Sequence, residues 1–174
     1  MKRLTIILAA AALYCGTSMQ AQTGTGGAPA IKHAYESVKN NILRSAEKIP
    51  DEDYNFKPTS EIRSLGEVLN HVTAAQTRTC GALLGEHQNI SAEANTKSAI
   101  LNALRESFSE CDRAYDSVTD ANLFQSIETP HGQMSRLAIL VGNAMHDEEQ
   151  YGILSVYMRL KGITPPSSEH PASR

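Results

Sequence analysis

Two histidines and a glutamine have the residue types and the spacing of an incomplete metal site. His146 and Gln150 lie four residues apart in "NAMHDEEQYGIL", residues 143–154, so they share one face of a helix. His71 lies in a second amphipathic segment. Neutral imidazoles bind zinc or nickel through one ring nitrogen, whereas the amide oxygen of Gln150 is a weaker ligand. Glu149, in the same segment, offers a carboxylate as the alternative third ligand.

The same residues also allow a purely structural interpretation. Histidines on different helices can be partly buried and hydrogen-bonded, and the acidic run 147–149 is typical of a solvated helix face. Ser64 is better placed to cap a helix than to act as a nucleophile, and "GTGG" near residue 24 follows no strand and is no phosphate loop. The formal charge is −3 and no basic stripe is present, which argues against a nucleic-acid partner.

Four amphipathic helices are predicted to position these residues. Apolar residues recur at helical spacing over about 31–48, 64–85, 96–118 and 134–161. Ser64 and Glu67 have the spacing of a capping box, and Gly162 ends the last helix. The segment "FQSIETPHGQMS", with Pro130 and Gly132, interrupts the helical pattern and is not assigned a strand. The pattern predicts an all-α four-helix bundle, and two linkers of about ten residues leave its topology open.

The beginning of the chain predicts export. Lys2 and Arg3 precede an apolar run, residues 4–15, which has signal-peptide length and is shorter than the ~20 residues of a membrane span. The expected organisation is a signal peptide at 1–21, a flexible leader at 22–30, the bundle at 31–166 and a loose tail at 167–174. Cleavage would leave no stable membrane span and a chain of 14 basic and 19 acidic residues. An uncleaved anchor is the alternative.

Two cysteines remain after the predicted cleavage. Export would place Cys80 and Cys111 in an oxidising compartment, where they could pair. A disulfide requires their Cα atoms to lie within ~7 Å, which the sequence does not reveal. Two small buried side chains are the favoured interpretation.

Four stretches of the chain carry a resemblance to a known family. They are "IPDEDYNFKPTSEIRSLGEVLNHV" at 49–72, "SFSECDRAY" at 107–115, "GQMSRLAILVGNAMHDEEQYGIL" at 132–154 and "YMRLKGITPP" at 157–166. Together they resemble the DinB/YfiT-like family of bacterial four-helix bundles, which implies an up-down-down-up topology over about residues 31–166. Many members bind zinc or nickel through three histidines, one on the second helix and two on the last. The matching positions here are His71, His146 and Gln150, so the resemblance implies a family metal site whose third histidine is replaced.

Three functions are compatible with these observations, and whether the chain is an enzyme stays open. The first is an exported binding module with a degenerate metal or small-molecule pocket between the second and fourth helices. The second is a divalent-metal-dependent thiol transferase or hydrolase, in which His71 and His146 hold the metal and Gln150 or Glu149 completes the shell. The third is a helical scaffold without a site, which forms a homodimer through one face of the bundle.

Overall fold

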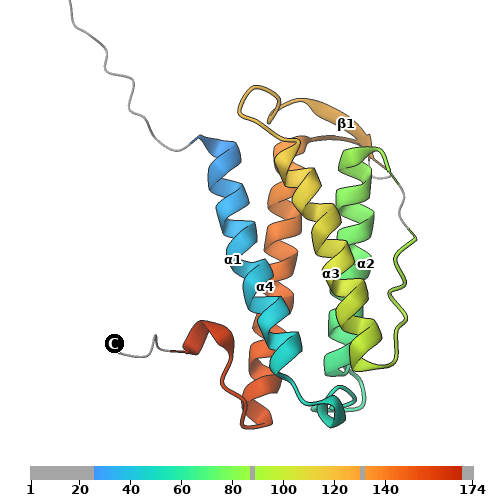
Figure 1. The fold of residues 1–174 in the computed structure, drawn as a ribbon. Helices are drawn as coiled ribbons and strands as arrows, with labels where there is room; N and C mark the ends of the chain where they lie inside the picture. Colours follow the sequence, from blue (N-terminus) through green and yellow to red (C-terminus); the bar gives the residue numbers. More distant parts are fainter. Residues whose placement is uncertain (1–25, 87–88, 130–131, 170–174) are drawn as a thin grey trace, which may run out of the picture.

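The chain folds into a bundle of four helices, seen in a computed structural model that describes residues 26–86, 89–129 and 132–169 (Figure 1). The helices are α1 (Gly27–Lys48), α2 (Leu65–Leu84), α3 (Lys97–Asp116) and α4 (Arg136–Leu160). The shorter elements are the 3-10 turns η1 (Asp51–Asp53) and η2 (Pro166–Ser168) and the strands β1 (Ser126–Thr129) and β2 (Gly132–Ser135). The predicted signal peptide and residues 22–25 and 170–174 lie outside the described residues.

The helices follow the up-down-down-up topology that the family resemblance implies. Helix α1 packs against α3 and α4, and α2 packs against the same two helices. Helices α2 and α3 run in one direction, and α1 and α4 run in the other (Figure 1). Residues 89–96 follow the length of the bundle, so that α3 begins at the same end as α2. The Asn70 amide holds this segment by donating to the Ala94 carbonyl at 2.8 Å. The predicted fold class is confirmed.

Local signals set the ends of the helices. The Ser64 hydroxyl accepts a hydrogen bond from the Glu67 backbone N–H, and the Glu67 carboxylate accepts one from the Ser64 N–H, which completes the predicted capping box. Helix α2 ends at Gly85, whose φ of 69° is a conformation that glycine adopts at little cost. The Thr96 side chain caps α3 by accepting a hydrogen bond from the Ala99 backbone N–H.

Helix α1 begins earlier than the apolar pattern predicts. It starts at Gly27, so residues 27–30 of the expected flexible leader are helical. The first turn is fixed by a long-range contact, because the backbone N–H of Ala28 donates to Asp120 at 2.8 Å. Residues near the start of the chain therefore depend on a partner about ninety positions away, which no local pattern indicates.

Two other segments are more ordered than expected. The interruption before α4 is an antiparallel hairpin, in which Ile127 pairs with Met134 and Glu128 with Gln133. Its strands have four residues each, too few for a clear alternation of apolar and polar positions. The start of the predicted loose tail forms η2, and the Glu169 carboxylate that follows pairs with basic side chains of α1.

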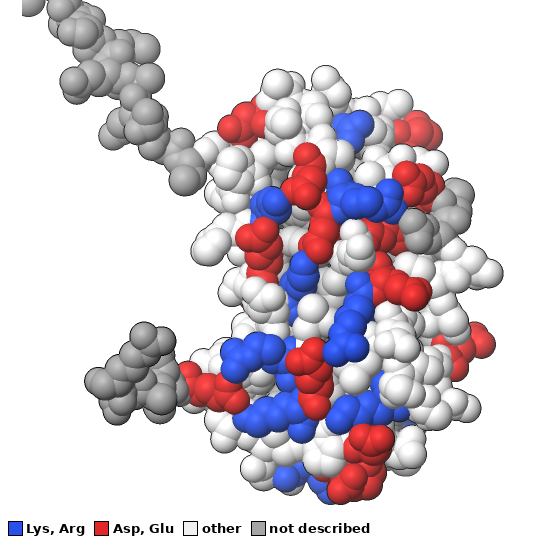
Figure 2. Space-filling model, in the orientation of Figure 1, with Lys and Arg blue, Asp and Glu red and all other residues white. Residues whose placement is uncertain are grey.

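The surface over α1 and α3 is covered by paired charges. In Figure 2, basic and acidic side chains alternate across this face of the bundle. Between the two helices, Lys39 pairs with Asp112 at 2.6 Å and Arg105 pairs with Glu47 at 2.8 Å. Among the described residues, no helix combines the length and apolar character that crossing a bilayer requires.

Candidate metal centre

Helices α2 and α4 bring His71 and His146 together. Their Nε2 atoms lie 3.1 Å apart, and their ring centroids are 5.0 Å apart at an interplanar angle of 62°. Both side chains are partly buried. The contact exists because α2 and α4 are neighbours and each histidine lies beside the buried stripe of its own helix. The structure thus places the two predicted histidines in direct contact, across 75 positions of sequence.

Gln150 lies one helical turn beyond His146 on α4 and is almost fully buried, with 4% of its surface exposed. Its carbonyl oxygen Oε1 has no hydrogen-bond partner among the described residues. A buried acceptor without a partner costs free energy, so it needs an explanation such as a bound ion. Glu149 is exposed, and no three His, Cys, Asp or Glu side chains in the described chain converge on one point. This favours Gln150 over Glu149 as the third ligand.

The two imidazoles fit one metal ion. Nitrogens bound to a tetrahedral zinc ion at about 2.0–2.1 Å lie roughly 3.3 Å apart. The observed Nε2–Nε2 separation of 3.1 Å is close to that value. Gln150, whose Oε1 is buried and unpartnered among the described residues, lies one helical turn from His146, the spacing at which paired histidines bind zinc in other helices. The two imidazoles therefore fit a divalent metal, and Gln150 is the candidate for a third ligand, weaker than an imidazole.

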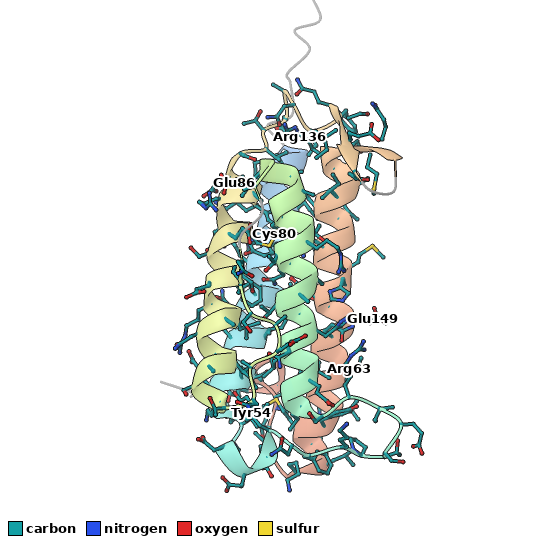
Figure 3. All side chains as sticks on the ribbon, turned by 90° about the vertical axis from the view of Figure 1, so that its right-hand side faces the viewer. Tyr54, Arg63, Cys80, Glu86, Arg136 and Glu149 are labelled. Atoms are coloured by element: carbon teal, nitrogen blue, oxygen red, sulfur yellow. A yellow bond between two sulfur atoms is a disulfide. The ribbon has the colours of Figure 1, made fainter. Side chains whose placement is uncertain are left out.

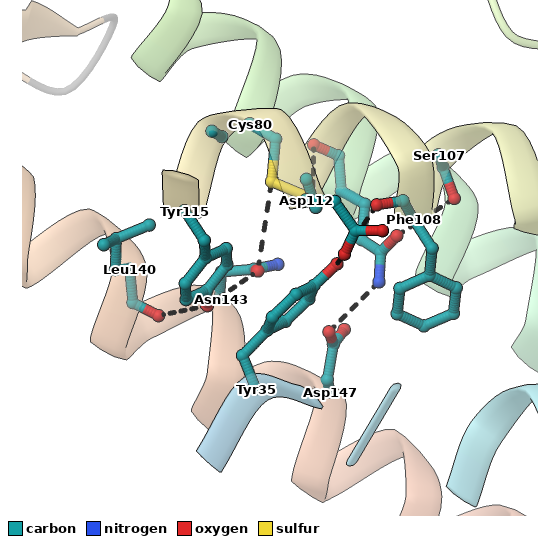
Figure 4. Close-up of a disulfide and its surroundings, with 12 residues drawn as sticks. Tyr35, Cys80, Ser107, Phe108, Asp112, Tyr115, Leu140, Asn143 and Asp147 are labelled. Atoms are coloured by element: carbon teal, nitrogen blue, oxygen red, sulfur yellow. Dashed lines mark hydrogen bonds between the residues drawn. A yellow bond between two sulfur atoms is a disulfide. The ribbon is translucent and has the colours of Figure 1, made fainter. Parts of the chain in front are cut away.

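Asp147, which the sequence analysis assigned to a solvated face, is fully buried beside His146. Its Oδ1 lies 3.7 Å from His146 Nδ1, and its Oδ2 accepts a 3.0 Å hydrogen bond from the Gln76 amide, drawn in Figure 4. Burial raises the pKa of the Asp147 carboxyl, and His146 and Gln76 act against that rise. The missed signal is spacing, because Asp147 lies seven residues from both Leu140 and Leu154 on the buried stripe of α4.

Charged side chains surround the His71 imidazole. Burial is the largest cause that holds the pKa of His71 below its ordinary value of 6.5, and the charges of Arg63, His146 and Arg78 act in the same direction. The Glu149 carboxylate acts in the opposite direction. In Figure 3, Arg63 and Glu149 lie on the side of the bundle formed by α2 and α4. A lowered pKa keeps the imidazole neutral at pH 7, the form that binds metals.

Two cavities meet at the segment before α2. One has a volume of about 660 Å³ and includes His71 in its wall, and the other, of about 710 Å³, includes Gln150. Glu61, Ile62 and Arg63 line both. The candidate metal centre therefore borders spaces of the size that small-molecule sites have.

A disulfide joins Cys80 of α2 to Cys111 of α3, so the interpretation of these residues as two separate thiols is wrong. Their Cα atoms are 5.1 Å apart because α2 and α3 are neighbours along their length. Spacing in the sequence could not show this, because the pairing depends on which helices are in contact. The Cys111 sulfur lies 3.9 Å from the Gln76 backbone carbonyl oxygen, and the Cys80 sulfur lies 3.9 Å from the Asn143 side-chain oxygen on α4.

Comparisons with known proteins identify the family. The profile of the DinB family matches residues 20–173. A DinB-like protein from Bacillus subtilis has a similar structure, with 22% identity and a TM-score of 0.65, over 82% of this chain and 96% of that one. A DinB-like protein from Bacillus cereus gives 17% identity and a TM-score of 0.64, over 78% and 93% of the two chains.

A conserved protein from Enterococcus faecalis has the same fold, with 12% identity and a TM-score of 0.63, over 79% of this chain and 98% of that one. At these identities the structural matches show the fold alone. A comparison with curated protein sequences finds no match. The family profile spans nearly all of the chain, including both histidines and Gln150, and the chain therefore belongs to the DinB family.

Proposed function

We propose that the protein is a metal-binding module in which His71 and His146 hold one zinc or nickel ion between α2 and α4. The observation that carries the proposal is the 3.1 Å separation of the two Nε2 atoms. Both imidazoles present the same ring nitrogen, Nε2, to each other. A metal ion between them would bind the lone pair of each Nε2. Gln150 supplies the third ligand through its buried, unpartnered Oε1.

Asp147 supports this arrangement from behind His146. A histidine that binds metal through Nε2 carries its proton on Nδ1, and a carboxylate facing Nδ1 stabilises that tautomer. The Oδ1 of Asp147 faces Nδ1 at 3.7 Å and has no hydrogen-bond partner among the described residues. The other carboxylate oxygen is held by Gln76, which fixes the orientation of the carboxylate.

The third ligand favours binding over robust catalysis. A bound zinc or nickel ion would supply a Lewis acid with open coordination positions at the edge of both cavities. An amide oxygen is a weaker donor to these ions than an imidazole nitrogen, so Gln150 lowers the affinity relative to a three-histidine site. This donor set suits a module that takes up and releases the metal ion, or that binds a ligand through the bound ion.

The proposal extends to the place where the protein works, which we infer is an oxidising compartment outside the cytoplasm. Disulfides persist in such compartments and are rare in the cytosol. The buried bond between Cys80 and Cys111 supports this location, as does the basic and apolar start of the chain. N-terminal sequencing of native protein is expected to find a start near Gln22, and intact protein beginning at Met1 in the cytosol would contradict export.

Zinc and nickel titration of the full chain tests the metal proposal. Calorimetry after removal of metal with a chelator is expected to give one ion per chain. His71→Gln and His146→Gln should each weaken binding by at least about a hundredfold, roughly 2.7 kcal/mol, because only one imidazole remains. His33→Gln is the matched control, because His33 is exposed on α1. No binding by the parent chain, or equal affinities in all three variants, would refute the proposal.

A further inference from the structure

Two arginines near the histidine pair have no partner of opposite charge among the described residues. Arg63 and Arg78 form no hydrogen bond or ion pair with the described residues, and Arg63 lines the cavity of about 660 Å³ together with His71. Elsewhere in the bundle, Arg44, Arg105 and Arg113 each pair with a glutamate, whereas Arg136 and Arg159 form no ion pair with the described residues and line neither cavity. Two cations beside a proposed cation site repel a bare metal ion. The same cations favour a negatively charged ligand at that place.

Arg63 also lies beside an apolar groove. Its charge acts on the Tyr157 hydroxyl, and both side chains line the cavity of about 710 Å³. The aliphatic wall of this cavity includes two unusually exposed side chains, Ile62 with 40% and Val156 with 55% of their surface accessible. The rest of the apolar wall is Val68 and Ile153. Covering apolar surface of this kind with an apolar group is favourable, because it removes that surface from water.

We propose that this groove binds a small amphipathic carboxylate, with its head group at Arg63 beside His71 and its apolar body across Val156 and Tyr157. The inference rests on the proposed function for the position of the head group, which lies at the edge of the metal centre. The planar guanidinium of Arg63 can donate two parallel hydrogen bonds to one carboxylate. The volume of the groove is within the range for ligands of this size.

Acidic side chains reduce the positive charge around the groove. Arg63 supplies a positive charge in the walls of both cavities, and Arg78 supplies a second one two helical turns beyond His71 on α2. The carboxylates of Glu61, in the walls of both cavities, and of Glu149 offset part of that charge. The net positive charge around the head-group position is therefore small.

Octanoate is the probe for the test, with acetate and octylammonium as matched ligands. Calorimetric titration uses the full chain, once after metal removal and once loaded with zinc. Octanoate is expected to bind at least about tenfold more tightly than acetate, because its additional methylenes cover the groove wall. Octylammonium, which has the same chain and the opposite charge, is expected not to bind. Equal binding of octanoate and acetate, or of octanoate and octylammonium, would overturn the inference.

Variants place the ligand in the groove. Arg63→Gln should weaken both acetate and octanoate by at least about fivefold, whereas Arg105→Gln, on the far side of the bundle, should change neither. Val156→Ser should weaken octanoate about threefold and leave acetate unchanged. Leu160→Ser is its control, because Leu160 is also exposed on α4, with 61% of its surface accessible, and does not line the groove. Loss of octanoate binding in the control variants but not in the groove variants would contradict the assignment.

The two proposals fail in different ways. Octanoate binding that depends on Arg63 in a chain that takes up no zinc would refute the metal module and leave the carboxylate site intact. Zinc binding by a chain that does not discriminate between octanoate and acetate would refute the carboxylate site and leave the metal module intact. Binding of the chain to phosphatidylglycerol vesicles in place of free octanoate would identify a membrane surface as the partner and overturn the small-molecule inference.

Discussion

The two long sides of the bundle use charge differently. Between α1 and α3, Lys39 pairs with Asp112 and Arg105 pairs with Glu47, and the Tyr35 ring stacks on that of Tyr115 at 3.9 Å. On the side of α2 and α4, Arg63, just before α2, and Arg78, on α2, have no partner of opposite charge among the described residues, and a buried carboxylate faces a histidine at 3.7 Å. The α1–α3 side satisfies its polar groups, and the α2–α4 side leaves several of them unsatisfied.

This difference separates stability from function. Satisfied pairs and stacked rings hold the helices together and need nothing else. Unsatisfied buried groups such as Asp147 Oδ1 and Gln150 Oε1 cost stability, and natural proteins accept that cost mainly at functional sites. The comparison therefore predicts that changes on the two sides affect different properties of the protein.

Removing the disulfide is expected to have the largest effect, and on stability alone. The double variant Cys80→Ala and Cys111→Ala should lose about 3–4 kcal/mol of unfolding free energy, because the bond closes a loop across 31 positions of sequence. Zinc affinity should change by less than about threefold, since neither sulfur is a ligand. Urea unfolding and zinc calorimetry measure the two properties. A large loss of zinc affinity at unchanged stability would contradict the separation.

Asp147→Asn is expected to weaken zinc binding by about 10- to 100-fold. The asparagine amide would donate to His146 Nδ1, which favours the tautomer with its proton on Nε2, and that proton blocks the metal-binding lone pair. Nitrogen-15 NMR of the imidazole reports the tautomer directly. Asp112→Asn, which removes a carboxylate on the α1–α3 side, is the control. An unchanged tautomer together with unchanged affinity would show that Asp147 does not orient His146.

Gln150→His is expected to tighten zinc or nickel binding at neutral pH by at least about tenfold, roughly 1.4 kcal/mol. The variant replaces an amide oxygen with an imidazole nitrogen at a buried position one turn from His146. Glu149→His is the comparison, since Glu149 is exposed and should give a smaller gain. Calorimetry on the parent and both variants decides between the two positions. Equal gains would mean that Gln150 does not face the ion.

The smallest predicted effect concerns the pKa of His71. Arg63→Gln should raise this pKa toward its ordinary value of 6.5, because the arginine charge helps to lower it. In the parent, the unfolded chain takes up the His71 proton before the folded chain does, so stability falls as the pH falls below about 6.5. The variant should lose less stability over that window. Proton NMR of the imidazole checks the shift, and an unchanged pKa would show that Arg63 lies too far from His71.

Short-range patterns made much of the fold predictable from the sequence. The capping box at Ser64 and Glu67 and the glycine at 85 act within one helical turn, so the ends of α2 were predicted correctly. The hairpin at 126–135 was missed because its strands are short, and the early start of α1 was missed because it depends on Asp120.

The candidate site was predictable only where spacing carries information. His146 and Gln150 share a helix face, and the resemblance to the DinB family supplied His71 as the partner from α2. Asp147 was assigned to solvent because it stands in an acidic run, although the three-dimensional packing buries it. The disulfide depends on contact between α2 and α3, which no local pattern encodes.

X-ray absorption spectroscopy of the zinc-loaded full chain tests the central claim most directly, because it counts the ligands of the bound ion. The account predicts two imidazole nitrogens at about 2.0–2.1 Å, with the remaining ligands oxygen and no sulfur. The same measurement on Gln150→His should find three imidazoles. One imidazole or none in the parent chain, or a sulfur ligand, would contradict the claim that His71 and His146 hold the ion together.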